Sequence, residues 1–82
     1  MTNEEFREWL RGFFELSDQG VVLDLNQINI ITNHLNLAEA VAGRLDETNA
    51  QLSADIQAIR SRPGPKPEDL AAFTQTIQKR LY

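Results

Sequence analysis

The chain has 82 residues, no cysteine, one histidine and a formal net charge of −4. This length allows one domain with a small core, and small domains are often stabilised by disulfides, a metal or association with other chains. Because there is no cysteine and only one histidine, disulfides, thiolate zinc sites and polyhistidine sites within one chain are excluded. We therefore expect oligomerisation. The scattered acidic charge argues against nucleic-acid binding through a basic surface.

The N-terminal segment has the pattern of an amphipathic helix over about residues 3–17. Thr2 and Glu5 have the T-x-x-E form of a capping box. Phe14 lies at the rim of the apolar face, and the sequence "SDQG" predicts the end of the helix, with Gly20 suited to a left-handed turn. Apolar residues at helical spacing predict the face that packs in the core: Phe6, Trp9, Leu10, Phe13 and Leu16.

A second helix is predicted after the stretch "GVVL", which we interpret as an extended linker. Asp24 and Gln27 have the spacing of another capping box, and Leu23 and Ile28 have that of a hydrophobic staple. No proline interrupts the residues that follow. The sequence therefore predicts a long central helix over about residues 25–61, roughly 55 Å in length.

The central helix carries a seven-residue apolar repeat, which predicts a left-handed supercoil with another helix. Asn49 is the single polar residue at the a and d positions, where an Asn fixes register and chain number at a cost in stability. Replacing Asn49 with Leu is therefore predicted to raise thermal stability. The predicted oligomer interface consists of Ile28, Ile31, Leu35, Ala38, Ala42, Leu45, Asn49, Leu52, Ile56 and Ile59.

Two interpretations of this repeat are open at Gly43, because a glycine inside a helix costs about 1 kcal/mol relative to alanine. In one, the helix is continuous and pairs with a second chain, and Asp55 faces Arg60 of the partner subunit. In the other, the helix breaks at Gly43 and the stripe is the core of a compact bundle. Ile30 and Leu37 lie off the seam, and we expect the N-terminal helix to cover them in a helical hairpin.

The sequence "RSRPGPKPEDL" predicts a proline-rich break over residues 62–67. Pro67 then suits the start of a helix over about residues 67–81, with acids in its first turn and Lys79 and Arg80 in its last turn. Its apolar stripe consists of Leu70, Phe73, Ile77 and Leu81.

Together these elements predict one all-α domain over residues 1–82. It combines a helical hairpin, a long heptad-patterned central helix and a C-terminal helix, in an oligomeric helical bundle.

The sequence carries little that supports catalysis. Its serines have no nucleophile motif around them, it lacks a glycine-rich phosphate loop, and His34 is the only imidazole. We predict a protein that is not an enzyme and that binds no cofactor or metal. His34 lies beside the seam, either as a flanking residue or as a ligand contact at an oligomer interface. The residues predicted to contact a partner or ligand are Arg7, Arg11, Phe14, His34, Arg44, Asp46 and Glu47.

The stretches "EWLRGFFEL" and "NQINIITNHL" also carry a resemblance. The first matches a W-L-x-G-[FY]-x-E motif through Trp9, Leu10, Gly12, Phe13 and Glu15, and the second provides Gln27, Ile31, His34 and Leu35. In these features, over about residues 6–37, the chain resembles a group of small proteins encoded by tailed bacteriophages. The resemblance implies phage origin and an accessory role.

The expected function is that of a non-enzymatic interaction protein, for example an inhibitor of a host defence complex, similar to an anti-CRISPR protein, that acts by surface occlusion. The alternatives are a virion assembly protein, such as a scaffold or tail chaperone, and an oligomeric sponge for a nucleotide signal. The expected partners are a second copy of the chain, as a dimer, and a host protein or complex, without direct nucleic-acid or membrane binding. With no signal peptide and no membrane-spanning apolar run, the predicted location is the cytoplasm, that of the host if the protein is phage-encoded.

Overall fold

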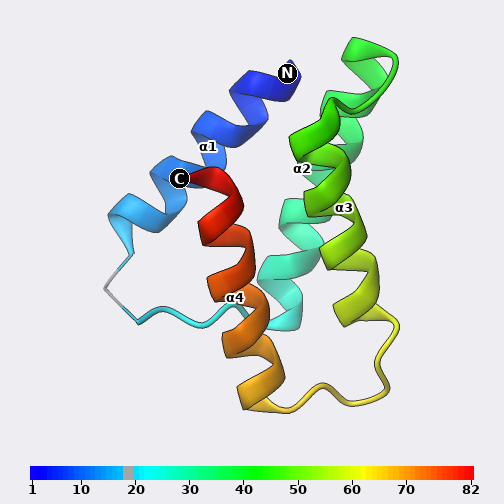
Figure 1. Ribbon diagram of the computed structural model, residues 1–82. Coiled ribbons are helices and arrows are strands. Elements are labelled where there is room, and N and C mark those ends of the chain that lie inside the picture. Colours follow the sequence, from blue (N-terminus) through cyan, green and yellow to red (C-terminus); the bar gives the residue numbers. More distant parts are fainter. Residues whose placement is uncertain (18–19) are drawn as a thin grey trace.

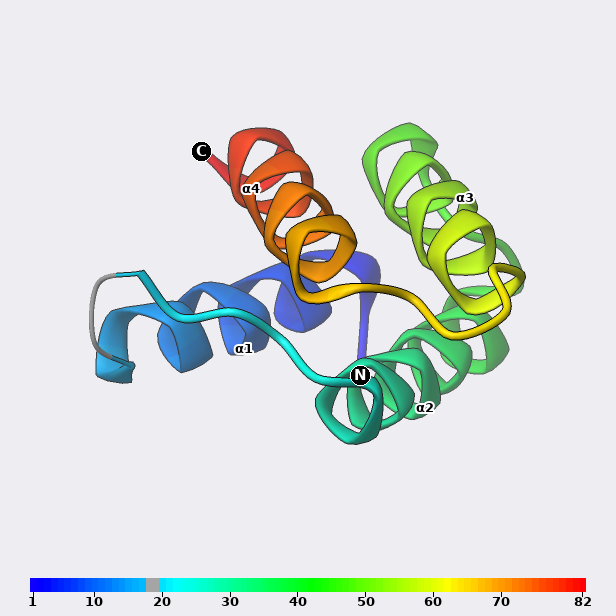
Figure 2. The ribbon, with the colours of Figure 1, turned by 90° about the horizontal axis from the view of Figure 1, so that it is seen from below.

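The computed structural model describes residues 1–17 and 20–82, and these form four helices without a strand. The helices are α1 (Asn3–Leu16), α2 (Leu25–Ala42), α3 (Glu47–Arg60) and α4 (Pro67–Leu81). They alternate in direction, as two hairpins, α1–α2 and α3–α4, that are joined where α2 packs against α3 (Figures 1 and 2). Helix α1 is inclined to the other three (Figure 1). The predicted all-α fold class is confirmed.

Local sequence signals set most helix ends. The Thr2–Glu5 and Asp24–Gln27 capping boxes both form, with the Gln27 N–H donating to Asp24 Oδ1 at 2.8 Å. Helix α1 ends at Leu16, one residue before the predicted end, and Gly20 has the expected positive φ of 84°. The rest of the predicted stop signal, at positions 18 and 19, lies outside the described residues. Helix α4 covers the predicted residues 67–81.

The prediction of one continuous helix over residues 25–61 is wrong, because α2 and α3 are separate helices. Gly43 adopts the left-handed conformation, with φ of 83°, and its N–H donates to the Glu39 carbonyl at 2.8 Å, which closes α2. Asp46 then begins α3 by accepting the Asn49 N–H at 2.9 Å. The longest extent of the molecule is consequently 34 Å, shorter than the roughly 55 Å of the predicted helix.

The seven-residue repeat forms a core within one chain, so its prediction as an interface between chains is wrong. The break at Gly43 folds the two halves of the repeat back on each other, and the apolar faces of α1 and α4 complete the core. Leu45 is half-buried, and Ala42 is exposed at the end of α2. The other eight residues of the predicted interface are buried: Ile28, Ile31, Leu35, Ala38, Asn49, Leu52, Ile56 and Ile59.

The core-facing side of α1 also differs from the prediction. Phe6, Leu10 and Phe14 are buried, at spacings of four residues, whereas Leu16 is 92% exposed. Trp9 and Phe13 are half-buried against the edge of the core. Phe14 is therefore a core residue and not a rim residue, and its prediction as a partner contact is wrong.

Candidate interaction surface

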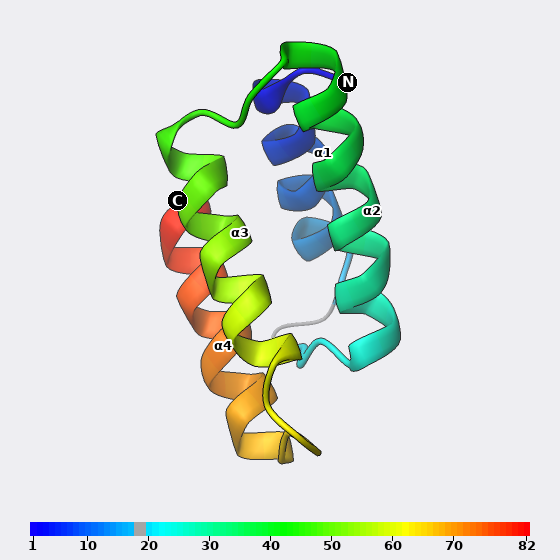
Figure 3. The same ribbon diagram turned by 90° about the vertical axis from the view of Figure 1, so that its right-hand side faces the viewer.

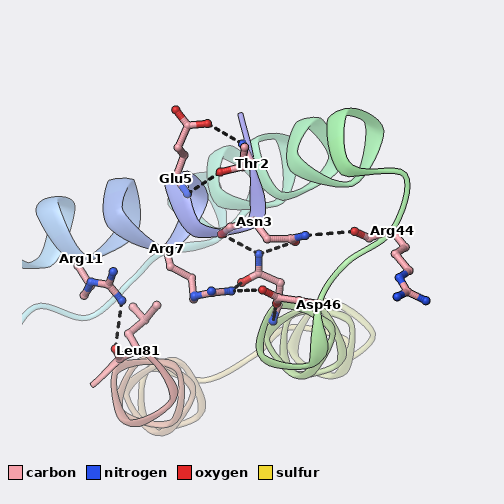
Figure 4. Close-up of polar contacts among 9 residues, drawn as sticks. Thr2, Asn3, Glu5, Arg7, Arg11, Arg44, Asp46 and Leu81 are labelled. Carbon is pink, nitrogen blue, oxygen red and sulfur yellow. Dashed lines mark hydrogen bonds and ion pairs between the residues drawn. The ribbon is translucent and has the colours of Figure 1, made fainter.

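Two of the predicted contact residues, Arg7 and Asp46, belong to a polar network at one end of the bundle. The N-terminus of α1 and the α2–α3 loop lie at this end (Figure 3). Arg7 Nη1 donates to Asp46 Oδ2 at 2.7 Å and to Asn49 Oδ1 at 3.0 Å (Figure 4). Asn49 Nδ2 donates to the carbonyl and side-chain oxygens of Asn3, at 3.0 and 2.8 Å. The network ties α1 to the start of α3.

The network also explains why Asn49 occupies an apolar repeat. Its side chain is fully buried, but both its amide nitrogen and its carbonyl oxygen have partners within the chain. Partial burial alone would raise the pKa of Asp46, but the hydrogen bond from the Asn49 N–H and the adjacent Arg7 guanidinium outweigh it and hold that pKa below its usual value. Arg7 and Asp46 thus pair with each other and do not project as free contact residues.

Of the remaining charged contact residues, Arg44 and Glu47 line a shallow hollow together with Asp46, whereas Arg11 bonds elsewhere. Arg11 Nη1 donates to the Leu81 carbonyl at 3.3 Å and so links α1 to the C-terminus. Arg44 and Glu47 are exposed, and the Arg44 side chain points away from the network (Figure 4). Because Phe14 is buried and Arg11 bonds to the Leu81 carbonyl, these two residues do not form a common site with His34 within one chain.

Residues 1–17 and 20–82 contain neither an unpartnered buried polar side-chain atom nor a group of metal ligands. Their buried side-chain nitrogen and oxygen atoms all have hydrogen-bond partners. No group of three or more acidic or histidine side chains in these two ranges is placed to hold a metal ion. Nor does any helix of the described chain combine the length and the apolar character needed to cross a membrane.

The most unusual surface lies on the outer face of α2. Ile30, Leu37 and Val41 are 44%, 57% and 62% exposed, although they are large aliphatic residues. Together with His34 they are spaced by four, three and four residues, so they lie along one line of the helix. We call these four residues the outer stripe. The prediction that α1 covers Ile30 and Leu37 is therefore wrong for Leu37, and about half of Ile30 stays uncovered.

The outer stripe is continuous with the edge of α1. The Trp9 and His34 rings stack with their centroids 4.0 Å apart and their planes 7° from parallel. His34 Nδ1 lies 2.9 Å from the Ile30 carbonyl oxygen, which only accepts, so the proton is on Nδ1. A small apolar hollow between the helices is lined by Trp9, Phe13, Gln27, Ile30 and Ile31. His34 is thus part of this surface, and its ring faces Trp9 of α1.

The outer stripe also lacks charge. Glu39 is the only Asp, Glu, Lys or Arg among the 18 residues of α2. At 3.6 residues per turn it lies about 180° from Ile30 around the helix. Depletion of charge with an adjacent aromatic residue is typical of the central part of protein interfaces. The predicted contact residues did not include Trp9, Ile30, Leu37 and Val41, although the four-three-four spacing of uncharged residues in α2 could be seen in the sequence.

Chemically, this surface can bind by burying apolar area, with Trp9 and His34 as its aromatic border. It presents no charged group for recognising an anion or a cation. Comparison of the chain with protein-family models, with curated proteins and with solved structures finds no match.

Proposed function

We propose that this chain is a non-enzymatic interaction module that binds a protein partner through the outer stripe of α2 and the adjoining Trp9. The observation that supports this is the run of three half-exposed aliphatic residues on an uncharged helix face. Apolar surface gains about 25 cal/mol per Å² when it is removed from water. Contiguous exposed apolar patches in soluble proteins commonly mark contact sites for other molecules.

The geometry favours a helical or extended partner segment that lies along α2. Side chains at four-three-four spacing present a straight ridge, and amphipathic helices bind such surfaces through residues spaced by three and four positions. Trp9 adds a large ring at the edge of the ridge, and tryptophan is enriched among residues that dominate binding energies. Binding of this kind inhibits a partner by covering a surface that the partner needs.

The resemblance to small phage proteins leads us to propose a host protein complex as the target, with inhibition of a defence complex, as by an anti-CRISPR protein, as the leading case. A small chain with an uncharged contact ridge is suited to surface occlusion. Arg44 and Glu47, which are exposed and follow Val41 in the sequence, would supply polar contacts at the border of such an interface.

The proposal is tested by site-specific photo-crosslinking in cells that naturally produce the protein. A photoreactive phenylalanine analogue replaces Leu37 in one variant and Gln75, an exposed residue of α4, in the matched control. We expect a covalent adduct with another protein species from the Leu37 position only, to be identified by mass spectrometry. Equal adducts from both positions, or no adduct other than one at twice the 9.3 kDa mass of the chain, would contradict the proposed function.

A further inference from the structure

We propose that the outer stripe also binds a second copy of this chain, in an antiparallel and two-fold symmetric contact between two α2 helices. This inference rests on the proposed function in so far as both assign the outer stripe as a contact surface. It deepens that function, because self-association would mask the surface and a partner would have to compete with it.

The symmetry of the stripe is the first argument. Ile30 and Val41 lie equally far from the point between Leu35 and Asn36, and His34 and Leu37 are also equidistant from it. A two-fold axis through that point pairs Ile30 of each chain with Val41 of the other and His34 with Leu37. Isologous contacts require such self-complementary surfaces. The four-three-four spacing is also that of about three turns of a coiled-coil seam.

Charge is the second argument. The chain has a net charge of −4, so two copies repel each other, and a contact through an uncharged surface adds the least to this repulsion. The outer stripe is such a surface, since Glu39, the only charged residue of α2, is on the opposite side of the helix. A highly charged partner, by contrast, would find no complementary group on the stripe. Among possible occupants, a second copy therefore fits the electrostatics of this acidic chain.

The size of the surface sets the strength of the contact. Helix α2 has 18 residues, so the shared face is about 27 Å long and roughly 10 Å wide. Even about 600 Å² of buried surface per chain, the upper limit for weak interfaces, would be roughly a ninth of the 5225 Å² that the chain exposes. We therefore expect a dimer with a Kd above about 1 µM, in which free and paired chains exchange with each other.

The first part of the test is sedimentation velocity on the full chain, from about 10 µM to about 1 mM, a range that brackets a weak interface. We expect the average mass to rise from 9.3 kDa towards twice that value. An average mass that stays at 9.3 kDa over the whole concentration range would overturn the proposed dimer. It would leave the outer stripe open to other proteins, so the proposed function would stand.

The second part tests the register with Ile30→Lys and Val41→Glu. Each variant alone should weaken self-association by about tenfold or more, because it places a charge against an apolar residue of the other chain. In an equal mixture, the introduced lysine and glutamate face each other at one end, and the native Val41–Ile30 contact persists at the other end. The mixture should therefore recover association to within about threefold of the unmodified chain.

The control for this experiment is Leu25→Glu. Leu25 is as exposed as Ile30, at 45%, but lies on another side of α2. This variant should associate like the unmodified chain, and circular dichroism should show native helix content for all variants. A dimer that survives both single substitutions, one that Leu25→Glu disrupts equally, or a mixture without recovery would each overturn the antiparallel contact. A mixture without recovery excludes this register without bearing on other partners, which the crosslinking experiment tests separately.

Discussion

The two hairpins of this bundle treat their apolar residues differently. In the α3–α4 hairpin, the leucine, isoleucine and phenylalanine side chains are buried or half-buried, and none of the exposed large hydrophobic residues found in the described chain belongs to either helix. In the α1–α2 hairpin, by contrast, Leu16, Leu25, Ile30, Leu37 and Val41 are exposed.

The polar residues show the same contrast. Helices α3 and α4 are linked across their surface by Arg80, which binds Asp55 and also donates to Gln51 at 3.1 Å. Helix α2 has no ion pair among the described contacts, and its outer face is apolar or amide-bearing. Since surface ion pairs contribute little to stability, the difference between the hairpins bears less on folding than on binding to other molecules. The α3–α4 hairpin has a polar surface suited to water, whereas the α1–α2 hairpin leaves an apolar surface exposed.

The largest expected effect comes from comparing two leucines of α2. Leu35→Ala, at a site 3% exposed, should lower the free energy of unfolding by about 3 kcal/mol, because it leaves a cavity in the core. Leu37→Ala, at a site 57% exposed, should change it by less than about 0.5 kcal/mol. Urea unfolding of dilute protein measures both. Similar losses for the two variants would mean that the outer stripe is covered, and the contrast between hairpins would disappear.

The second prediction concerns the network that joins the hairpins and reverses the one made from sequence. Asn49→Leu should lower the free energy of unfolding by about 2 kcal/mol, because hydrogen bonds to Arg7 and Asn3 are lost in a fully buried position. Asn36→Leu, at an exposed position of α2, is the control and should be nearly neutral. A gain of stability in the Asn49 variant would restore its interpretation as a register-fixing residue between chains.

The third prediction concerns the connection between the hairpins. Gly43→Ala should lower the free energy of unfolding by about 1 kcal/mol, because the position has φ of 83°, a conformation that alanine adopts only at a cost. A steric clash does not contribute, since a new Cβ would meet no atom within 4 Å. Gly12→Ala, which also meets no atom but lies inside α1, should instead raise it by about 0.5–1 kcal/mol. Thermal unfolding of both variants provides the comparison. The same sign for both would show that Gly43 does not set the break.

The smallest effect is a pH dependence at the same junction. Since the pKa of Asp46 is lowered in the folded chain, its contribution is present above the usual aspartate pKa of about 3.9 and is lost as the pH falls through the lower folded value. Acid destabilisation should therefore be weaker in Asp46→Asn, which keeps a good helix cap without the charge.

Urea midpoints between about pH 5 and pH 2 measure this difference. Glu5 and Asp69 also have lowered pKa values, so the unmodified chain and Asp46→Asn should both lose stability in acid, and the difference between them isolates Asp46. Identical pH profiles would show that the interactions of the Asp46 carboxylate with the Asn49 N–H and Arg7 do not influence folding.

Much of the candidate surface could not have been found from the repeat alone. The heptad pattern matches burial at eight of its ten positions, but it is equally compatible with a seam between chains and with a core within one chain. Ile30 and Leu37 are recognisable as lying off the repeat. Their exposure could not be inferred, because it depends on the incline of α1, which places Trp9 over His34 and leaves Leu37 uncovered.

The sequence by itself determined the all-α class, both N-terminal capping boxes and the span of α4, since caps, prolines and helical periodicity act over a few residues. It also determined which residues of the repeat are apolar. Only the tertiary structure decided that the chain turns at Gly43, that Asn49 finds its partners in α1, and that Phe14 is in the core. Each of these depends on contacts between residues distant in sequence. In the same way, Leu37 is exposed because α1 does not cover it.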